Sequence, residues 1–167
     1  DIFPFVVAHT GVKRSSGRIH RPIRERWLEG DQEVVRSYLR IAHLARMAKR
    51  ALLVRDWKTL GEMMLENHEI QRDLGGSGPE NERLIQAALD GKAFGAKLAG
   101  AGGGGTIVAL APNPEPVIKA LNAAGASRIL TPKPTPGIIL TPLKTEQDQQ
   151  AAKQELSYRA EQEDFHS

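Results

Sequence analysis

The glycines of this sequence are clustered, and the cluster is the feature that could do chemistry. Six of the 16 glycines lie between Gly95 and Gly105, and only Ala101 interrupts the run from Gly100 to Gly105. A glycine inside a helix or strand costs about 0.5–1 kcal/mol relative to alanine, so the run does not serve a regular element. Because glycine permits positive φ and lacks a Cβ, consecutive N–H groups can converge on an anion. Phosphate is the anion that we expect.

The run differs from two phosphate-binding patterns of fixed spacing. No Gly-Lys-Ser/Thr ends it, as a P-loop requires, and it does not open a helix at the spacing of the dinucleotide-binding fingerprint. A flexible linker or a tight hairpin turn is the alternative. Apolar residues at 94–98 and 107–110 flank the run, which argues against a linker, and a hairpin needs fewer glycines. An anion-binding loop is therefore the favoured interpretation.

A second group of residues suited to anions lies near the N-terminus. Its positive residues, opposed nearby only by Glu25, are Lys13, Arg14, Arg18, His20, Arg21, Arg24 and Arg26. Arginine offers a planar fork of donors that matches phosphate and carboxylate, although charge alone favours a solvated helix face. Elsewhere the signs are mixed, and the net charge is only +3. Aromatic residues do not interleave with the basic ones, so a nucleic-acid partner is disfavoured.

Composition excludes several classes of site. The 167 residues contain no cysteine, which rules out a disulfide scaffold, a thiolate metal site and a cysteine nucleophile. His43 and His68 lack the second histidine of a zinc-binding helix, so no metal site is predicted. No run approaches the roughly 20 apolar residues that span a bilayer. We expect a cytoplasmic protein with no membrane segment.

Hydrophobic periodicity and turn residues predict an α+β fold. Strands are predicted at 2–8, 93–99, 106–111, 127–131 and 137–143, and helices at 22–28, 31–54, 56–74, 77–90 and 114–124. Asp31 and Asp56 are the predicted N-caps of the second and third helices. This order indicates helices packed on one face of a mostly antiparallel sheet of four to five strands. Residues 1–143 form the predicted domain, and residues 144–167 a polar helical or disordered tail.

The sequence Lys-Leu-Ala-Gly-Ala-Gly-Gly-Gly-Gly at 97–105, followed by an apolar strand, resembles the third motif of the GHMP kinases. This superfamily includes galactokinase, homoserine kinase, mevalonate kinase and phosphomevalonate kinase. Residues 10–16 resemble a substrate-contacting segment of the mevalonate kinases. Residues 16–31 and 60–68 look closer to sugar-1-kinases of the glucuronokinase type. The resemblance covers about residues 5–140 and implies the family's C-terminal domain, with a ferredoxin-like core. Ala99 departs from the Ser or Thr of many members.

The resemblance implies an ATP-dependent phosphotransferase that acts on the alcohol of a sugar or related small molecule, with ATP and Mg²⁺. The residues that would bind phosphate are Gly100, Ala101, Gly102, Gly103 and Gly104, and those that would bind the acceptor are Arg14 and Ser16. The family's N-terminal domain, which carries the ATP loop and the general base, has no counterpart here. No catalytic residue is assigned in this chain. We expect the partner to be an N-terminal kinase domain of the same protein, and the chain alone to be inactive.

Two other classes of function stay open at this point. One is a non-catalytic anion- or nucleic-acid-binding module of similar α+β form. The other is a subunit-interface piece whose glycine loop packs against another chain. Without the resemblance, Ser15, Ser16 and Gly17 could equally form a simple polar turn.

Overall fold

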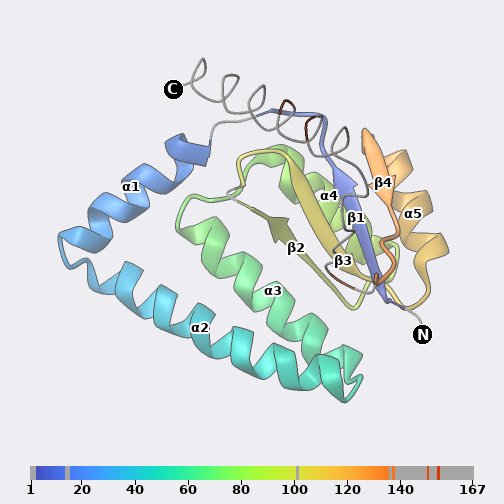
Figure 1. Cartoon of the computed structure of the whole chain (residues 1–167), viewed down its shortest axis with the longest axis horizontal. Coiled ribbons are helices and arrows are strands. Elements are labelled where there is room, and N and C mark those ends of the chain that lie inside the picture. The colour runs from blue at the N-terminus through green and yellow to red at the C-terminus, as the bar shows by residue number, and fades with distance from the viewer. Residues whose placement is uncertain are drawn as a thin grey trace. The chain divides into compact units, whose positions relative to one another are not determined.

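The apolar segment near the N-terminus forms a central strand of an antiparallel sheet. The computed structural model describes residues 3–13, 16–100, 102–135, 137, 150 and 154. In it, β1 (Phe5–His9) pairs with β3 (Thr106–Leu110) on one side and β4 (Arg128–Leu130) on the other. The other partner of β3 is β2 (Gly95–Ala99), so the strand order is β2-β3-β1-β4, as in a ferredoxin-like fold (Figure 1).

Five helices are described between residues 16 and 123. They are α1 (Ser16–Leu28), α2 (Gln32–Leu53), α3 (Trp57–Asp73), α4 (Pro79–Asp90) and α5 (Pro114–Ala123). Together with the antiparallel sheet they confirm the predicted α+β class. None of these helices is both long and apolar enough to cross a membrane.

Most of the core lies between one face of the sheet and the helices α4 and α5. Val6 and Ala8 of β1 and Ile107 and Ala109 of β3 are fully buried there. Because side chains alternate along a strand, Val108 and Leu110 point to the opposite face. On that face they pack against Leu60 and Met64 of α3, so α3 adds cover to the second face, and α2 lies on the outer side of α3 (Figure 1).

The backbones of α3 and β2 approach closely because both carry glycine at the point of contact. A Cβ built on Gly61 would lie 2.2 Å from the carbonyl oxygen of Phe94, and one on Gly95 would lie 2.4 Å from that of Gly61. Real Cβ atoms do not approach other atoms so closely. The distance between helix and strand therefore depends on hydrogen at both positions.

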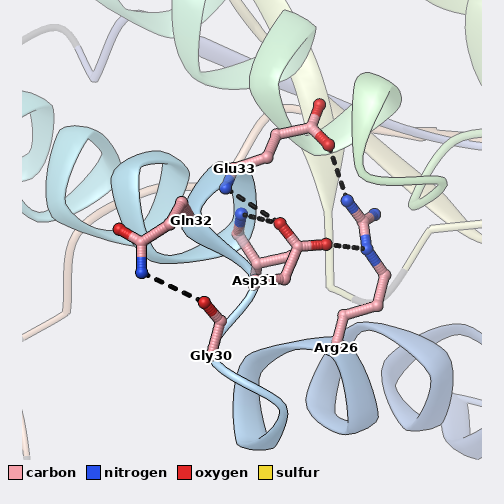
Figure 2. Close-up of polar contacts among 6 residues, drawn as sticks. Arg26, Gly30, Asp31, Gln32 and Glu33 are labelled. Carbon is pink, nitrogen blue, oxygen red and sulfur yellow. Dashed lines mark hydrogen bonds and ion pairs between the residues drawn. The ribbon is translucent and has the colours of Figure 1, made fainter.

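Asp31 caps α2, as predicted, and also ties α2 to α1. Its Oδ1 accepts hydrogen bonds from the N–H groups of Glu33 (2.9 Å) and Val34 (3.4 Å). The guanidinium of Arg26 donates to Asp31 Oδ2 (2.8 Å) and to Glu33 (2.6 Å) (Figure 2). The Arg26 hydrogen bond, helped by the two backbone donors, holds the pKa of Asp31 below its ordinary value of 3.8.

The predicted start of the first helix is wrong. Pro22 indicates the first turn of a short helix, yet α1 begins at Ser16 and contains Pro22 in its interior. Ile19 and Ile23 pack against Val34 and Leu74, in a cluster formed with α2 and the end of α3. This packing favours a longer helix despite the backbone hydrogen bond that proline removes.

Two compact units divide the chain, at 1–133 and 134–167, and the elements above all lie in the first. The predicted strand at 137–143 lies outside the described residues apart from Gly137, and so does the tail at 144–167 apart from residues 150 and 154. The predicted domain boundary at 143 stays a prediction.

The contact between α3 and β2 predicts an unusually costly glycine substitution. Gly61→Ala forces two backbones apart, so we expect it to lower the free energy of unfolding by about 3 kcal/mol or more, the upper end of overpacking effects. Urea unfolding measures the loss. The control is Gly125→Ala, where φ is +80° but a Cβ meets nothing within 4 Å, so that only about 1 kcal/mol of backbone strain is added. Equal losses in the two variants would contradict the proposed close contact.

The cap of α2 predicts a pH-dependent contribution to stability. Because the pKa of Asp31 is lower in the folded state, its carboxylate stabilises the fold above the unfolded pKa, and this stabilisation is lost as pH falls through the folded pKa. Asparagine also caps helices but does not pair with Arg26 as an anion. We therefore expect Asp31→Asn to be less stable than the native chain at neutral pH, with the difference shrinking below about pH 4. Urea unfolding at a series of pH values tests this, with Glu29→Gln in the preceding turn as control.

Candidate phosphate-binding site

The loop that joins β2 to β3 contains the glycine run. Ala99 pairs with Thr106 at the end of the two strands, so residues 100–105 form the connection. Every described residue of the loop has positive φ, with values of 87° at Gly100, 81° at Gly102, 70° at Gly103, 124° at Gly104 and 81° at Gly105. Since L side chains rarely adopt such angles, the path of this backbone requires the glycines.

The last residue of the loop is fixed to the end of β1. The N–H of Gly105 donates to Thr10 Oγ1 and to the carbonyl of Val12, both at 3.0 Å. In return, the carbonyl of Gly105 accepts from the N–H of Thr10 at 2.7 Å. Thr10 is only 6% exposed, so these bonds are largely shielded from solvent. One end of the loop is thus held by the central strand.

A buried asparagine of α4 holds Gly104, the residue before Gly105 in the loop. Asn81 is 0% exposed, and its Oδ1 accepts a hydrogen bond of 2.7 Å from the N–H of Gly104. Gly104 is one of the five residues predicted to bind phosphate, and the structure shows its N–H donating to Asn81. Nδ2 of Asn81 is buried and has no hydrogen-bond partner in the described part of the chain.

The middle of the loop lies against the segment that connects α3 to α4. A Cβ on Gly102 would lie 1.5 Å from the carbonyl oxygen of Gly76, so no side chain fits there. Gly78, the N-cap of α4, lies beside Gly103, and a Cβ on it would come within 3.4 Å of the Gly103 Cα. The two glycine-containing segments therefore pack backbone against backbone.

Side chains of α3 and α4 fix this connecting segment. The Ser77 hydroxyl donates to Oε1 of Glu82 on α4. His68 of α3, only 4% exposed, places its Nε2 3.1 Å from the same oxygen. The segment under the glycine loop is thus tied to α4 through Ser77, and the same carboxylate lies close to α3.

The first residue of the loop is open on its Cβ side and borders a pocket. A Cβ on Gly100 would meet nothing within 4 Å. Gly100 lines a pocket of about 90 Å³, together with Ile19, His20 and Ile23 of α1, Tyr38 and Ile41 of α2, and Gln71, Leu74 and Gly76 from the end of α3. Buried Oε1 of Gln71 has no hydrogen-bond partner in the described part of the chain. The pocket is mainly apolar, with a few polar groups.

The predicted acceptor-binding residues lie at the start of α1 or just before it. Ser16 is the first residue of that helix, which also supplies three residues to the pocket at Gly100. Arg14 lies outside the described residues, as does Ala101 of the predicted phosphate-binding set. The structure thus brings the helix that begins at Ser16 and the first glycine of the loop to one pocket.

Ion pairs engage part of the predicted basic cluster. Arg21 pairs with Glu25 at 3.0 Å, and Arg26 pairs with Asp31 and Glu33. Lys13, which follows the Val12 carbonyl bonded to the loop, is exposed. Among the described residues, no group of three or more His, Asp or Glu side chains could hold a metal ion.

The sequence does not single out Thr10 and Asn81, which hold the loop. Thr10 follows a predicted strand and reads as the start of a turn, and Asn81 reads as an ordinary residue in the first turn of a helix. A signal was present in both cases: Thr10 continues the buried alternation of Val6 and Ala8, and Asn81 lies one helical turn before the buried Leu84 and Ile85. Only the fold reveals that both face the glycine run.

Comparison with known proteins relates the chain to a family of kinases. Residues 48–128 match the family model described as GHMP kinases C terminal. Probable glucuronokinase 2 of Arabidopsis thaliana is 33% identical over 109 residues, which are 64% of this chain and 29% of that protein. Mevalonate kinase of Pyrococcus abyssi is 33% identical over 134 residues, 77% of this chain and 40% of that protein. The chain thus spans well under half the length of these curated relatives.

Solved structures show the same fold. The mevalonate kinase of L. major in complex with R-mevalonate superimposes with a TM-score of 0.69 at 31% identity, covering 75% of this chain and 40% of that one. The galactokinase of Lactococcus lactis complexed with galactose gives 0.54 at 20% identity, covering 72% and 41%. At that identity the second likeness shows the fold alone.

The buried bond between Asn81 and Gly104 predicts a specific loss on substitution. Asn81→Leu keeps similar bulk but leaves the Gly104 N–H buried without an acceptor. We expect a loss of about 1–3 kcal/mol of unfolding free energy, and faster amide hydrogen exchange at Gly104. Gln86→Leu on the exposed side of the same helix is the control and should change stability by no more than about 0.5 kcal/mol. Unchanged exchange at Gly104 would show that Asn81 does not hold the loop.

Proposed function

The chain belongs to the GHMP kinases, whose C-terminal domain it carries, and on this premise we propose that it supplies the glycine-loop part of an ATP-dependent kinase for a small-molecule alcohol. The observation that carries the proposal is the loop itself. It combines five glycines of positive φ with rigid attachment at Gly102, Gly104 and Gly105, and it opens at Gly100 onto a pocket.

In this proposal the loop holds phosphate oxygens with its backbone. Phosphoryl transfer requires mainly positioning and stabilisation of charge, which N–H groups can provide without side chains. Gly100, Ala101, Gly102 and Gly103 would donate N–H groups to the phosphates. Gly104 would contribute by having no Cβ, since its own N–H donates to Asn81.

The acceptor would lie at the start of α1, beside Gly100. Arg14 would neutralise negative charge on the acceptor or on the phosphoryl group, because a guanidinium matches both groups. Ser16 would hydrogen-bond an acceptor hydroxyl. Glucuronokinases and mevalonate kinases are among the relatives, so sugars, sugar acids and hydroxy acids are the acceptors to be tried.

The nucleotide and the metal ion would be held mainly by a second domain. The chain spans 29% of one curated relative and 40% of another, so most of each relative's length has no match in it. We therefore propose that an N-terminal kinase domain of the same protein binds ATP and Mg²⁺ and provides the general base. The cytoplasm, where ATP is abundant, is the proposed location.

An assay of ADP release tests this function. The chain is assayed alone and joined to the region encoded immediately upstream, with glucuronate, galactose and mevalonate as acceptors. We expect acceptor-dependent ADP release from the joined protein and none from the chain alone. Turnover by the chain alone would overturn the dependence on a second domain. Phosphate binding without turnover by either form, on any acceptor, would favour a non-catalytic anion-binding module.

The close contact at Gly102 predicts a large effect on the same activity. Gly102→Ala places a methyl group where the Gly76 carbonyl lies, so the loop must shift. A misplacement of about 1 Å can cost roughly 100-fold in rate, and we expect kcat of the joined protein to fall by about that factor. Gly125→Ala is the control. Gly125 also has positive φ but follows α5 and lies outside the glycine loop, so the activity should be kept. Equal activity of the two variants would contradict a role for the loop in catalysis.

A further inference from the structure

A second pocket lies outside the glycine loop, between α2, α3 and β2. Its volume is about 200 Å³. Leu44 and Ala48 of α2 and Met63 and Met64 of α3 give it apolar walls, and Asn67 of α3 and Lys97 of β2 are the polar residues in its lining. Helix α3 lies between α2 and β2, so all three elements meet around this space (Figure 1).

The ammonium group of Lys97 is the unusual feature of this pocket. Lys97 is half-buried, and its Nζ donates to the carbonyl of Leu98 at 2.7 Å. In the part of the chain that the structure describes, no carboxylate forms an ion pair with it. Burial lowers the pKa of Lys97. A partly desolvated cation that lacks an anionic partner is costly, and an anion placed beside it would offset that cost.

The walls of the pocket are held in place. Arg40 of α2 forms a two-pronged ion pair with Glu66 of α3, with distances of 2.5 and 2.8 Å. The two helices are therefore joined by a geometry that matches guanidinium to carboxylate. Methionine side chains line the α3 wall, and their flexibility lets such a surface adapt to apolar groups of different shape.

We propose that this pocket binds a small monocarboxylate with an apolar body of about six carbons. The carboxylate pairs with Nζ of Lys97, and the apolar body lies between Ala48, Met63 and Met64. The size follows from the volume: a cavity of about 150 Å³ holds benzene, so 200 Å³ suits hexanoate or benzoate. Charge complementarity selects an acid over an alcohol or an amine. The site is separate from the glycine loop and does not depend on the proposed kinase function.

Titration with three probes of equal chain length tests the proposal. Hexanoate, 1-hexanol and hexylammonium are added to the full chain, and the methyl resonances of Met63 and Met64 are followed by NMR. We expect saturable shifts with hexanoate, with a Kd of about 1–10 mM, as suits a ligand of this size. Hexanol should bind at least about tenfold more weakly, and hexylammonium should cause no saturable shift, because it places a second cation beside Lys97.

Variants separate the charge from the cavity. Lys97→Met removes the cation at similar bulk and should weaken hexanoate binding by about tenfold or more while leaving hexanol binding unchanged. Ala48→Leu fills the apolar wall and should abolish both. Lys119→Met on the exposed face of α5 removes one charge elsewhere and should bind hexanoate like the native chain. Amide spectra establish that each variant is folded.

Three outcomes would overturn the proposal. The first is the absence of a saturable shift with hexanoate and with benzoate up to about 50 mM, well above the expected Kd. The second is equal binding of hexanoate and hexanol, which would make the pocket merely apolar. The third is native affinity in folded Lys97→Met. If Lys97→Met does not fold, the comparison of the three probes on the native chain decides by itself.

Discussion

The direct contact of backbone with backbone along α3 is the constraint on which the candidate site depends. Gly61 meets Gly95 near the start of the helix, and Gly76 meets Gly102 just beyond its end. Both contacts lie along α3 and the connection that follows it, so the segment that sets the distance between α3 and β2 also borders the glycine loop.

The loop is rich in glycine, yet contacts with the surrounding segments fix its position. Thr10 comes from the end of β1, Asn81 from α4 and Gly76 from the connection after α3, and each contacts a different glycine. Glycine gives the loop access to positive φ, while these contacts select one conformation among the many that glycine allows. The conformation of the loop is therefore a property of the whole domain, and the glycine motif alone does not determine it.

Local signals in the sequence predicted the elements well, and contacts between distant segments account for what was missed. Asp31 and Asp56 cap helices as predicted. Such caps can be predicted from the sequence because the side chain accepts hydrogen bonds from residues only two or three positions away. Pro22 was misleading because packing of α1 against Val34 and Leu74 outweighs its local effect. The glycine run indicated a loop of positive φ. No residue near Gly104 in the sequence indicates that Asn81 accepts a hydrogen bond from the Gly104 N–H. The roles of Arg14, Ser16 and the loop in binding stay predictions.

The strand order also governs when the sheet can form during synthesis. Of the described elements β1 is made first, yet Phe5 pairs with Leu110 and Val7 with Leu130, so its partners are among the last of these elements to be made. Pairing across such a long separation is entropically costly and slow, whereas α2 and α3 are neighbours in sequence and can associate early. On the ribosome, the helical pair therefore precedes the sheet, and the apolar strand β1 must stay unpaired until β3 and β4 emerge. During this interval the apolar, unpaired β1 is open to capture by chaperones and to aggregation.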